Sequence, residues 1–407
     1  MRFQLKYLIY AAFFIAGGLT FSALTMLYPK RSPSLPAPSP VAKSEEPHNP
    51  SEDHGDHALV KEAEESAETP KEQSIAIDSK EIFQNTELLR AYVKTFGLDQ
   101  SIRQLHHLTA FYGDCHQPAH LAGRFAYQVF SSKVFQSFQS ECHSGGLHGA
   151  IEAYFMEHGI QNLAFDVDLI CRPDLNHFFY HQCIHGIGHG LMAWSNYELL
   201  DVLKYCDRLK RSHDSCWSGA FMENVVGGLG GHHAHGKSEH PNTKYLSEDP
   251  HYPCKILEDK YKGTCYFYQT SRMMTLFQGD FSRIASACAE TTESVQVYCY
   301  ESMGRDVGGV HRGDPQGAIK ACSTVPSSPS RIHCLTGAVQ DSFWDPSGQD
   351  KALHFCKLLT EETEKGDCYN TIFARAQQVL ASKNDLKRFC AKSEPPYRHR
   401  CLDLNQR

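Results

Sequence analysis

Three segments of the chain place metal-binding side chains four residues apart, the spacing that puts two side chains on one face of a helix. The pairs are His116 with His120, His148 with Glu152, and His185 with His189. Neutral imidazole binds Zn, Fe, Cu or Ni, and an added carboxylate suits Fe, Mn or a two-metal centre. The pattern therefore predicts a transition-metal site (Zn, Fe or Cu) in which the five histidines are the ligands.

Two glutamates and one arginine complete the predicted site. Glu152 and Glu223 are candidate general bases, because a carboxylate beside a metal-bound water can accept its proton. Arg124 lies four residues after His120 and could bind an anionic substrate group or a carboxylate. A metal that activates water or dioxygen would make the protein a metal-dependent hydrolase or oxidoreductase. Nucleophilic catalysis has little support, because the cysteines are predicted to pair and no serine elbow motif is visible.

The spacing of the sixteen cysteines predicts the fold that must position these residues. From Cys254 onward the first cysteine of each pair recurs every 34 residues, a period typical of stacked repeats. Zinc binding is the alternative, but no CxxC motif is present, and an even set of cysteines favours disulfides in an oxidising compartment. By elimination Cys115 pairs with Cys142. The predicted disulfides are Cys115–Cys142, Cys171–Cys183, Cys206–Cys216, Cys254–Cys265, Cys288–Cys299, Cys322–Cys334, Cys356–Cys368 and Cys390–Cys401.

Each repeat predicts a pair of helices. An amphipathic stretch begins at the second cysteine of a pair, as in 265–277 and 368–380, and a shorter stretch such as 280–288 ends on the next first cysteine. Asp or Ser residues at the start of several shorter stretches are suitable N-caps. Residues 142–401 thereby resemble the cysteine-rich, secreted branch of tetratricopeptide-like repeat solenoids. The resemblance implies an all-α, right-handed α-solenoid of about seven disulfide-stapled hairpins, whose first helices line a concave groove, and it implies no activity.

Distance from the cysteine separates packing positions from groove positions. The position one residue after the cysteine is nearly always apolar or aromatic, so it is predicted to pack, and His143 occupies it. The positions two and six residues after the cysteine share a polar, variable face, which places His148, His185 and His189 in the groove. His116 and His120 are out of this register, which predicts that their helix is rotated in the stack.

Glycine is frequent around the predicted ligands. Six glycines are expected inside helices, where each costs about 1 kcal/mol relative to alanine. Close approach of the backbone to a ligand or to a neighbouring helix would explain their presence. They are Gly145, Gly146, Gly149, Gly186, Gly188 and Gly190.

The N-terminus predicts an export segment. Arg2 and Lys6 precede an apolar run over 7–28 that is long enough to cross a bilayer. We interpret residues 1–30 as an uncleaved signal anchor that leaves the rest of the chain extracytoplasmic, with a cleaved signal peptide as the alternative. Residues 31–80 have the composition of a disordered linker. Its histidines are predicted to be solvated, with loose metal capture as the alternative: His48, His54 and His57.

One repeat is longer than the others. Its extra residues form a Gly/His-rich loop at 227–253, and loops of this length are often functional. Its histidines could close over the groove as a lid, or the loop could be a solvated insertion: His232, His233, His235 and His240. Because the chemistry is confined to the first repeats, we divide the ordered chain into metal-site repeats at 81–250 and scaffold repeats at 251–407.

Composition narrows the class of function. A net charge of -7 gives no general attraction to nucleic acid. The predicted protein is a membrane-anchored, extracytoplasmic metal-binding repeat protein, with an enzyme activity left open. The alternatives are a structural cluster of polar side chains without metal, or a scaffold whose groove binds a peptide, a cell-envelope partner, metal or haem. CxxCH is absent, so haem would have to be held by two histidines alone.

Overall fold

The cysteine period corresponds to a succession of paired helices in the computed structural model of the chain. The structure describes residues 81–82, 85–112, 115–136, 140–172, 175, 177–227, 243–344, 348–380 and 382–404. All of them belong to one compact unit, Gln73–Arg407. The predicted anchor, the predicted linker and the four loop histidines lie outside the described residues. Within the described residues, no helix has the length and apolar character needed to span a membrane.

The described residues contain sixteen α-helices, α3 to α18, and no strand. The long helices are α3 (Thr86–Tyr112), α4 (His116–Phe130), α5 (Gly145–His158), α7 (His177–Trp194), α9 (His213–Met222), α10 (Asp259–Leu276), α12 (Glu293–Val310), α14 (Ser328–Asp341) and α16 (Glu362–Val379). The other helices are α6 (Leu163–Ile170), α8 (Leu199–Cys206), α11 (Phe281–Ala289), α13 (Pro315–Cys322), α15 (Gly348–Leu358), α17 (Lys383–Ala391) and α18 (Pro395–Leu404). Helix α9 has only ten residues and is counted with the long helices because it occupies the same place in its repeat. The all-α prediction is confirmed for this part of the chain.

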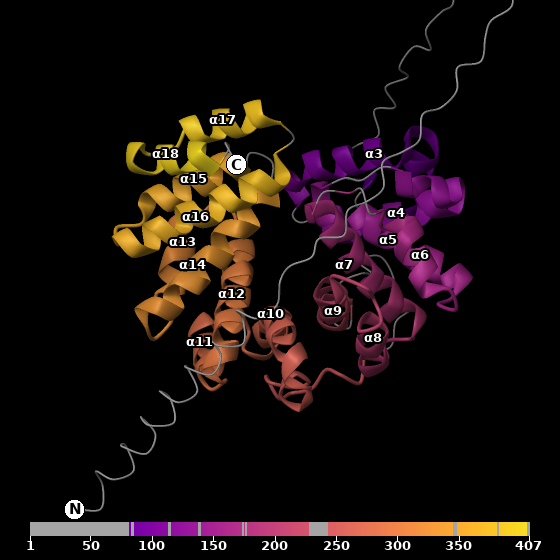
Figure 1. The fold of residues 1–407 in the computed structure, drawn as a ribbon, viewed down its shortest axis with the longest axis horizontal. Coiled ribbons are helices and arrows are strands. Elements are labelled where there is room, and N and C mark those ends of the chain that lie inside the picture. The colour runs from indigo at the N-terminus through magenta and orange to yellow at the C-terminus, as the bar shows by residue number, and fades with distance from the viewer. Residues whose placement is uncertain are drawn as a thin grey trace, which may run out of the picture. The chain divides into compact units, whose positions relative to one another are not determined.

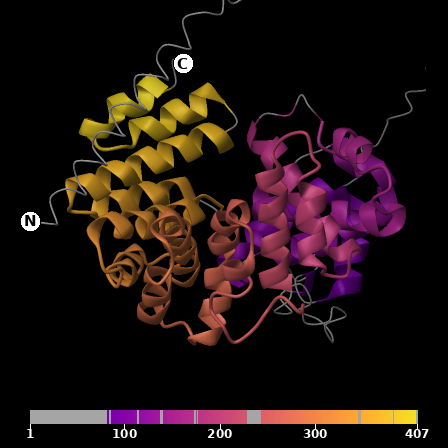
Figure 2. The same cartoon turned by 60° about the horizontal axis from the view of Figure 1, so that its bottom comes forward.

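The long helices form one continuous row. Helix α4 packs on α5, α5 on α7, and the row continues through α9, α10, α12 and α14 to α16 (Figure 1). The helices of the C-terminal repeats lie in parallel rows in a second view (Figure 2). Helix α16 also contacts α7. The predicted stack of helical hairpins is therefore present, while its right-handed sense stays a prediction.

All eight predicted disulfides are formed, including Cys115–Cys142, and no described cysteine is free. Their Cα–Cα distances run from 5.2 to 5.6 Å, the usual range for a disulfide. Most of them join the end of a short helix to the next long helix. The predicted start of the long helices at the second cysteine is wrong for several repeats. Helix α7 begins at His177, six residues before Cys183, and α10 begins at Asp259, before Cys265.

The predicted packing and capping residues behave mostly as expected. Residues directly after the second cysteine, such as Ile184, Leu335 and Tyr369, are buried in the core. The Asp280 side chain accepts hydrogen bonds from two backbone N–H groups at the start of α11, and the Ser382 side chain accepts one from the backbone N–H of Asp385 in α17. These caps satisfy N–H groups that have no partner inside the helix.

Glycines let the first long helices touch along their backbones. A Cβ built on Gly149 of α5 would lie 1.9 Å from the carbonyl oxygen of His120 in α4. A Cβ on Gly219 of α9 would lie 1.9 Å from the carbonyl oxygen of His185 in α7. The predicted close approach at glycine is confirmed, and its partner is the neighbouring helix. This contact brings the histidines of adjacent helices within reach of one another.

Candidate metal centre

Three consecutive long helices, and the turn that follows a fourth, contribute to one buried cluster of side chains. Helices α4, α5 and α7 and the π-helical turn after α9 carry, in chain order, His120, Glu152, His189 and Glu223. Three further histidines lie one turn earlier on the first three helices. We call these seven residues the His/Glu cluster: His116, His120, His148, His185, His189, Glu152 and Glu223. None of their exposed fractions exceeds 6%.

The cluster has the spacing of a metal site. His116, His120, His148 and His189 each offer a ring nitrogen, and these four atoms lie within 4.8 Å of one another. The Nε2 atoms of His116 and His120 are 3.1 Å apart, and those of His185 and His189 are also 3.1 Å apart. Two imidazole ligands bound to one ion at about 2.0–2.1 Å stand roughly 3 Å from each other. The five predicted histidines are thus brought together.

Every histidine of the two pairs has a partner on its other ring nitrogen. Nδ1 of His120 is 2.7 Å from Oε1 of Glu152, and Nδ1 of His189 is 2.7 Å from Oε2 of Glu223. Nδ1 of His116 is 2.9 Å from the carbonyl oxygen of Cys142, and that of His185 is 2.9 Å from Oγ of Ser218. When Nδ1–H donates, a neutral imidazole keeps its lone pair on Nε2. Carboxylates and carbonyls behind metal-bound histidines fix the ring and its tautomer in this way.

His148 faces the cluster with its opposite nitrogen. Its Nε2 is 3.2 Å from the carbonyl oxygen of Gln182 and donates to it. Its Nδ1 is buried and makes no hydrogen bond. A buried polar atom without a partner calls for a bound ion or water. His148 therefore supplies a nitrogen lone pair between the two histidine pairs.

The carboxylates of the cluster orient histidines. The second oxygen of Glu152 lies 3.2 Å from Nε of Arg124, in an ion pair. The second oxygen of Glu223 accepts a hydrogen bond of 2.7 Å from the hydroxyl of Tyr197. Arg124 thus has a carboxylate partner, one of the two predicted. With both oxygens of each glutamate engaged, an orienting role is better supported than the predicted role as general base.

The local backbone helps to place these groups. Cys142, His143 and Ser144 have φ angles of 51°, 54° and 58°, an uncommon left-handed stretch just before α5. This bend directs the Cys142 carbonyl at His116. After α9, Glu223 of the His/Glu cluster begins a single π-helical turn, Glu223–Gly227. Such turns are often found at functional sites.

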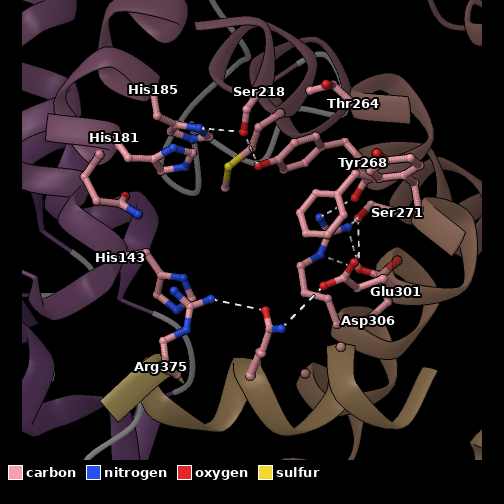
Figure 3. Close-up of a pocket in the computed structure, with 18 of the residues that line it drawn as sticks. His143, His181, His185, Ser218, Thr264, Tyr268, Ser271, Glu301, Asp306 and Arg375 are labelled. Carbon is pink, nitrogen blue, oxygen red and sulfur yellow. Dashed lines mark hydrogen bonds and ion pairs between the residues drawn. The ribbon is translucent and has the colours of Figure 1, made fainter. Parts of the chain in front are cut away.

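His143 does not occupy the packing position that the cysteine spacing predicts. Because α5 begins at Gly145, His143 lies in the bend before the helix. It is half-buried, as predicted, but its ring lies 5.7 Å from that of His116 and borders a cavity. Figure 3 shows it on the cavity wall.

A cavity of about 1130 Å³ adjoins the cluster (Figure 3). His116 and His185 form part of its wall, together with Glu301, Arg305 and Arg375. His148 and His189 are buried between helices, so the predicted groove position is wrong for them. The close helix contacts at glycine place these two rings inside the wall. The cluster is therefore buried, with His116 and His185 as its contact with the cavity.

The free energy of unfolding of the metal-free protein is expected to fall by about 2–3 kcal/mol between about pH 7 and pH 5.5. Burial, and then neighbouring histidines, hold the pKa of His148 and of His185 well below the ordinary 6.5. Below pH 6.5 the unfolded chain therefore binds more protons than the folded chain. The contribution of these two neutral histidines to the free energy of unfolding is complete above that pH, and it is lost as the pH falls toward their pKa in the folded protein. Urea unfolding at several pH values measures the slope.

A His185→Gln variant is the control for this pH dependence. It should retain about half of the slope, because one of the two buried histidines remains. If the free energy of unfolding of the wild type falls with pH no more steeply than exposed histidines would cause, the lowered pKa of His148 and His185 is contradicted.

Several residues of the site carry no signal in the cysteine spacing. Tyr197 follows the end of α7 and reaches Glu223, and Ser218 on α9 accepts from His185 and bonds Tyr268 at 2.7 Å. His177 and His181 precede Cys183, so a count that starts at the cysteine misses them. Continuing the four-residue step backwards from His185 would have found both.

Comparison of the chain with protein-family models, curated proteins and solved structures finds no match. The resemblance to tetratricopeptide-like solenoids stays a prediction, and the site must be interpreted from its own chemistry.

Proposed function

We propose that the chain is an extracytoplasmic metalloprotein whose His/Glu cluster binds a transition metal. The observation that carries the proposal is the common arrangement of the two histidine pairs. Each has its Nδ1 atoms held by acceptors and its Nε2 atoms 3.1 Å apart. The buried, unpartnered Nδ1 of His148 supports it independently. Imidazole donors suit Zn, Fe or Cu.

The cavity supports an enzyme rather than a purely structural metal. A closed set of four protein ligands is typical of structural zinc, whereas catalytic sites keep a position open. His116 and His185 belong both to the cluster and to the cavity wall. An ion held there would meet a molecule bound in the cavity. Hydrolysis or oxidation of that molecule is the reaction class we propose, with the metal supplying Lewis acidity or redox chemistry.

A non-catalytic scaffold is the second candidate. The cavity is lined by residues from repeats far apart in sequence, such as Phe178, Phe267 and Thr371, as a peptide-binding groove would be. Haem between the histidines is disfavoured. Neighbouring rings of the cluster have centroids 4.6 to 6.4 Å apart, which leaves no gap for a porphyrin between them.

Eight disulfides fit an extracytoplasmic protein. We propose further that residues 7–28 anchor it in the membrane, since this apolar run is long enough to span a bilayer.

Metal analysis of the purified protein beside His148→Ala and His189→Ala variants tests the proposal. Wild type is expected to contain stoichiometric transition metal. Each variant should lose most of it, because each removes one of the four clustered nitrogens. His354→Ala, an exposed histidine outside the cavity, is the matched control and should keep the wild-type content.

Two results would argue against the proposal. Wild type without stoichiometric metal, even after incubation with Zn, Cu and Fe salts, would indicate a polar cluster held together by the contacts of His120 with Glu152 and of His189 with Glu223. Equal metal content in both variants would place the metal elsewhere. Azide added to the Co²⁺-loaded protein separates the two candidates, because only an open coordination position lets azide change the visible spectrum.

A further inference from the structure

Helix α7 carries four histidines at a constant step of four residues: His177, His181, His185 and His189. This spacing aligns them along one face of the helix. Each step advances about 6 Å along the helix axis, so the row covers roughly 18 Å. Only its inner pair belongs to the His/Glu cluster. We call the four residues the α7 histidine row.

Helix α9 and the π-helical turn that follows it orient the inner three members of the row in the same way. Nδ1 of His181 is 2.7 Å from Oγ of Ser215, as that of His185 is 2.9 Å from Oγ of Ser218. Glu223 takes the same place behind His189. If Nδ1 is the protonated nitrogen in each ring, all three present Nε2 lone pairs. His181 is therefore prepared as a metal ligand although it lies outside the cluster.

Burial changes steadily along the row. His177 is exposed, His181 is half-buried, His185 is 6% exposed and His189 is fully buried. The outer three line the cavity, and Figure 3 shows His181 and His185 together on one wall. The row therefore leads from the open cavity to the buried cluster.

Both positively and negatively charged side chains surround the outer half of the α7 histidine row, His177 and His181. Asp214 raises the pKa of His181, while His177 and Arg375 lower it, and burial lowers it most. Burial thus favours the neutral imidazole that can bind an ion. Asp214 lines the cavity beside these histidines and supplies the negative charge that attracts a cation.

We propose that the α7 histidine row is the entry path for the metal ion. An ion binds first between His177 and His181, then between His181 and His185, and finally enters the cluster at His189. Each step exchanges one imidazole ligand for the next, with no change of oxidation state. The inference rests on the proposed metal site, and it assigns to His177 and His181 a role in loading rather than in final binding.

The rate of metal uptake tests this path. Metal-free full-length protein is mixed rapidly with Co²⁺, and the visible absorption of bound cobalt is followed with time. The double variant His177→Ala/His181→Ala is expected to load at least about tenfold more slowly, yet to reach the wild-type cobalt content. His354→Ala should load at the wild-type rate. Ser215→Ala, which keeps His181 but removes its orienting partner, should be slowed by a smaller factor.

The possible outcomes distinguish a failure of the proposed entry path from a failure of the proposed metal site. Equal loading rates in the double variant and wild type, at equal content, would overturn the path and leave the metal site intact. A lower final content in the folded double variant, with circular dichroism unchanged, would also overturn it, because these histidines would then be final ligands. Absence of cobalt binding by wild type would refute the metal site itself.

Discussion

Reduction of the eight disulfides is expected to unfold the helical repeats at room temperature without denaturant. Seven of them close loops with sequence separations of 10 to 12 residues. Each such loop contributes about 3 kcal/mol by limiting the entropy of the unfolded chain. Together they contribute on the order of 20 kcal/mol, more than the roughly 5–15 kcal/mol by which folded domains are usually stable. Circular dichroism during titration with a phosphine reductant measures the loss of helix.

The effect of one disulfide should depend on its place in the row of repeats. In a stack where each repeat contacts its neighbours, a terminal repeat can unfold alone. Cys390→Ser/Cys401→Ser is therefore expected to unfold the last helices while metal content stays at the wild-type level. Cys171→Ser/Cys183→Ser, which frees the start of α7, should lower metal content as well. A reduced protein that keeps full helicity, or equal metal loss in the two variants, would contradict this account.

The cysteine spacing predicted the fold because it constrains the structure in two ways. A 34-residue step requires repeated units, and each pair must lie within disulfide reach. The pairing of Cys115 with Cys142 followed from elimination alone and is confirmed. The same spacing failed to find the true start of α7, because the helix extends into the loop that the disulfide closes. His177 and His181 were missed for that reason.

The depth of each histidine could not be predicted from its position along a helix. His148, His185 and His189 share a face in sequence, but only His185 borders the cavity. Depth depends on how closely the neighbouring helix approaches, and Gly149 and Gly219 set that approach. Glycine frequency signalled close contact, yet the contacting partner appears only when adjacent repeats are placed side by side.

The carboxylates that orient His120 and His189 come from the next repeat along the row. Glu152 and Glu223 were identified as candidate catalytic groups because carboxylates near a metal often act as bases. Their contacts with His120 and His189 cross between repeats at sequence separations of 32 and 34. A separation close to the repeat length is a signal that sequence could supply once the period is known. Tyr197 offers no such signal, because it lies in the turn after α7.

Gly149→Ala is expected to destabilise the protein by about 3 kcal/mol or more and to abolish metal binding. The added Cβ would lie 1.9 Å from the carbonyl oxygen of His120, so α4 and α5 must separate. Overpacking of this kind typically costs 1–3 kcal/mol, and more where backbone must move. Separation of the two helices also pulls His120 away from Glu152, which disrupts the orientation of a ligand. Urea unfolding and metal analysis measure the two losses.

Gly366→Ala is the matched control for this prediction. Gly366 lies inside α16, and a Cβ there would have no neighbour within 4 Å. Alanine should then stabilise the helix by about 0.5–1 kcal/mol and leave metal content unchanged. Gly219→Ala, with its clash of 1.9 Å at the carbonyl of His185, should behave like Gly149→Ala. If both clashing variants match the control in stability and metal content, close backbone packing is not what assembles the His/Glu cluster.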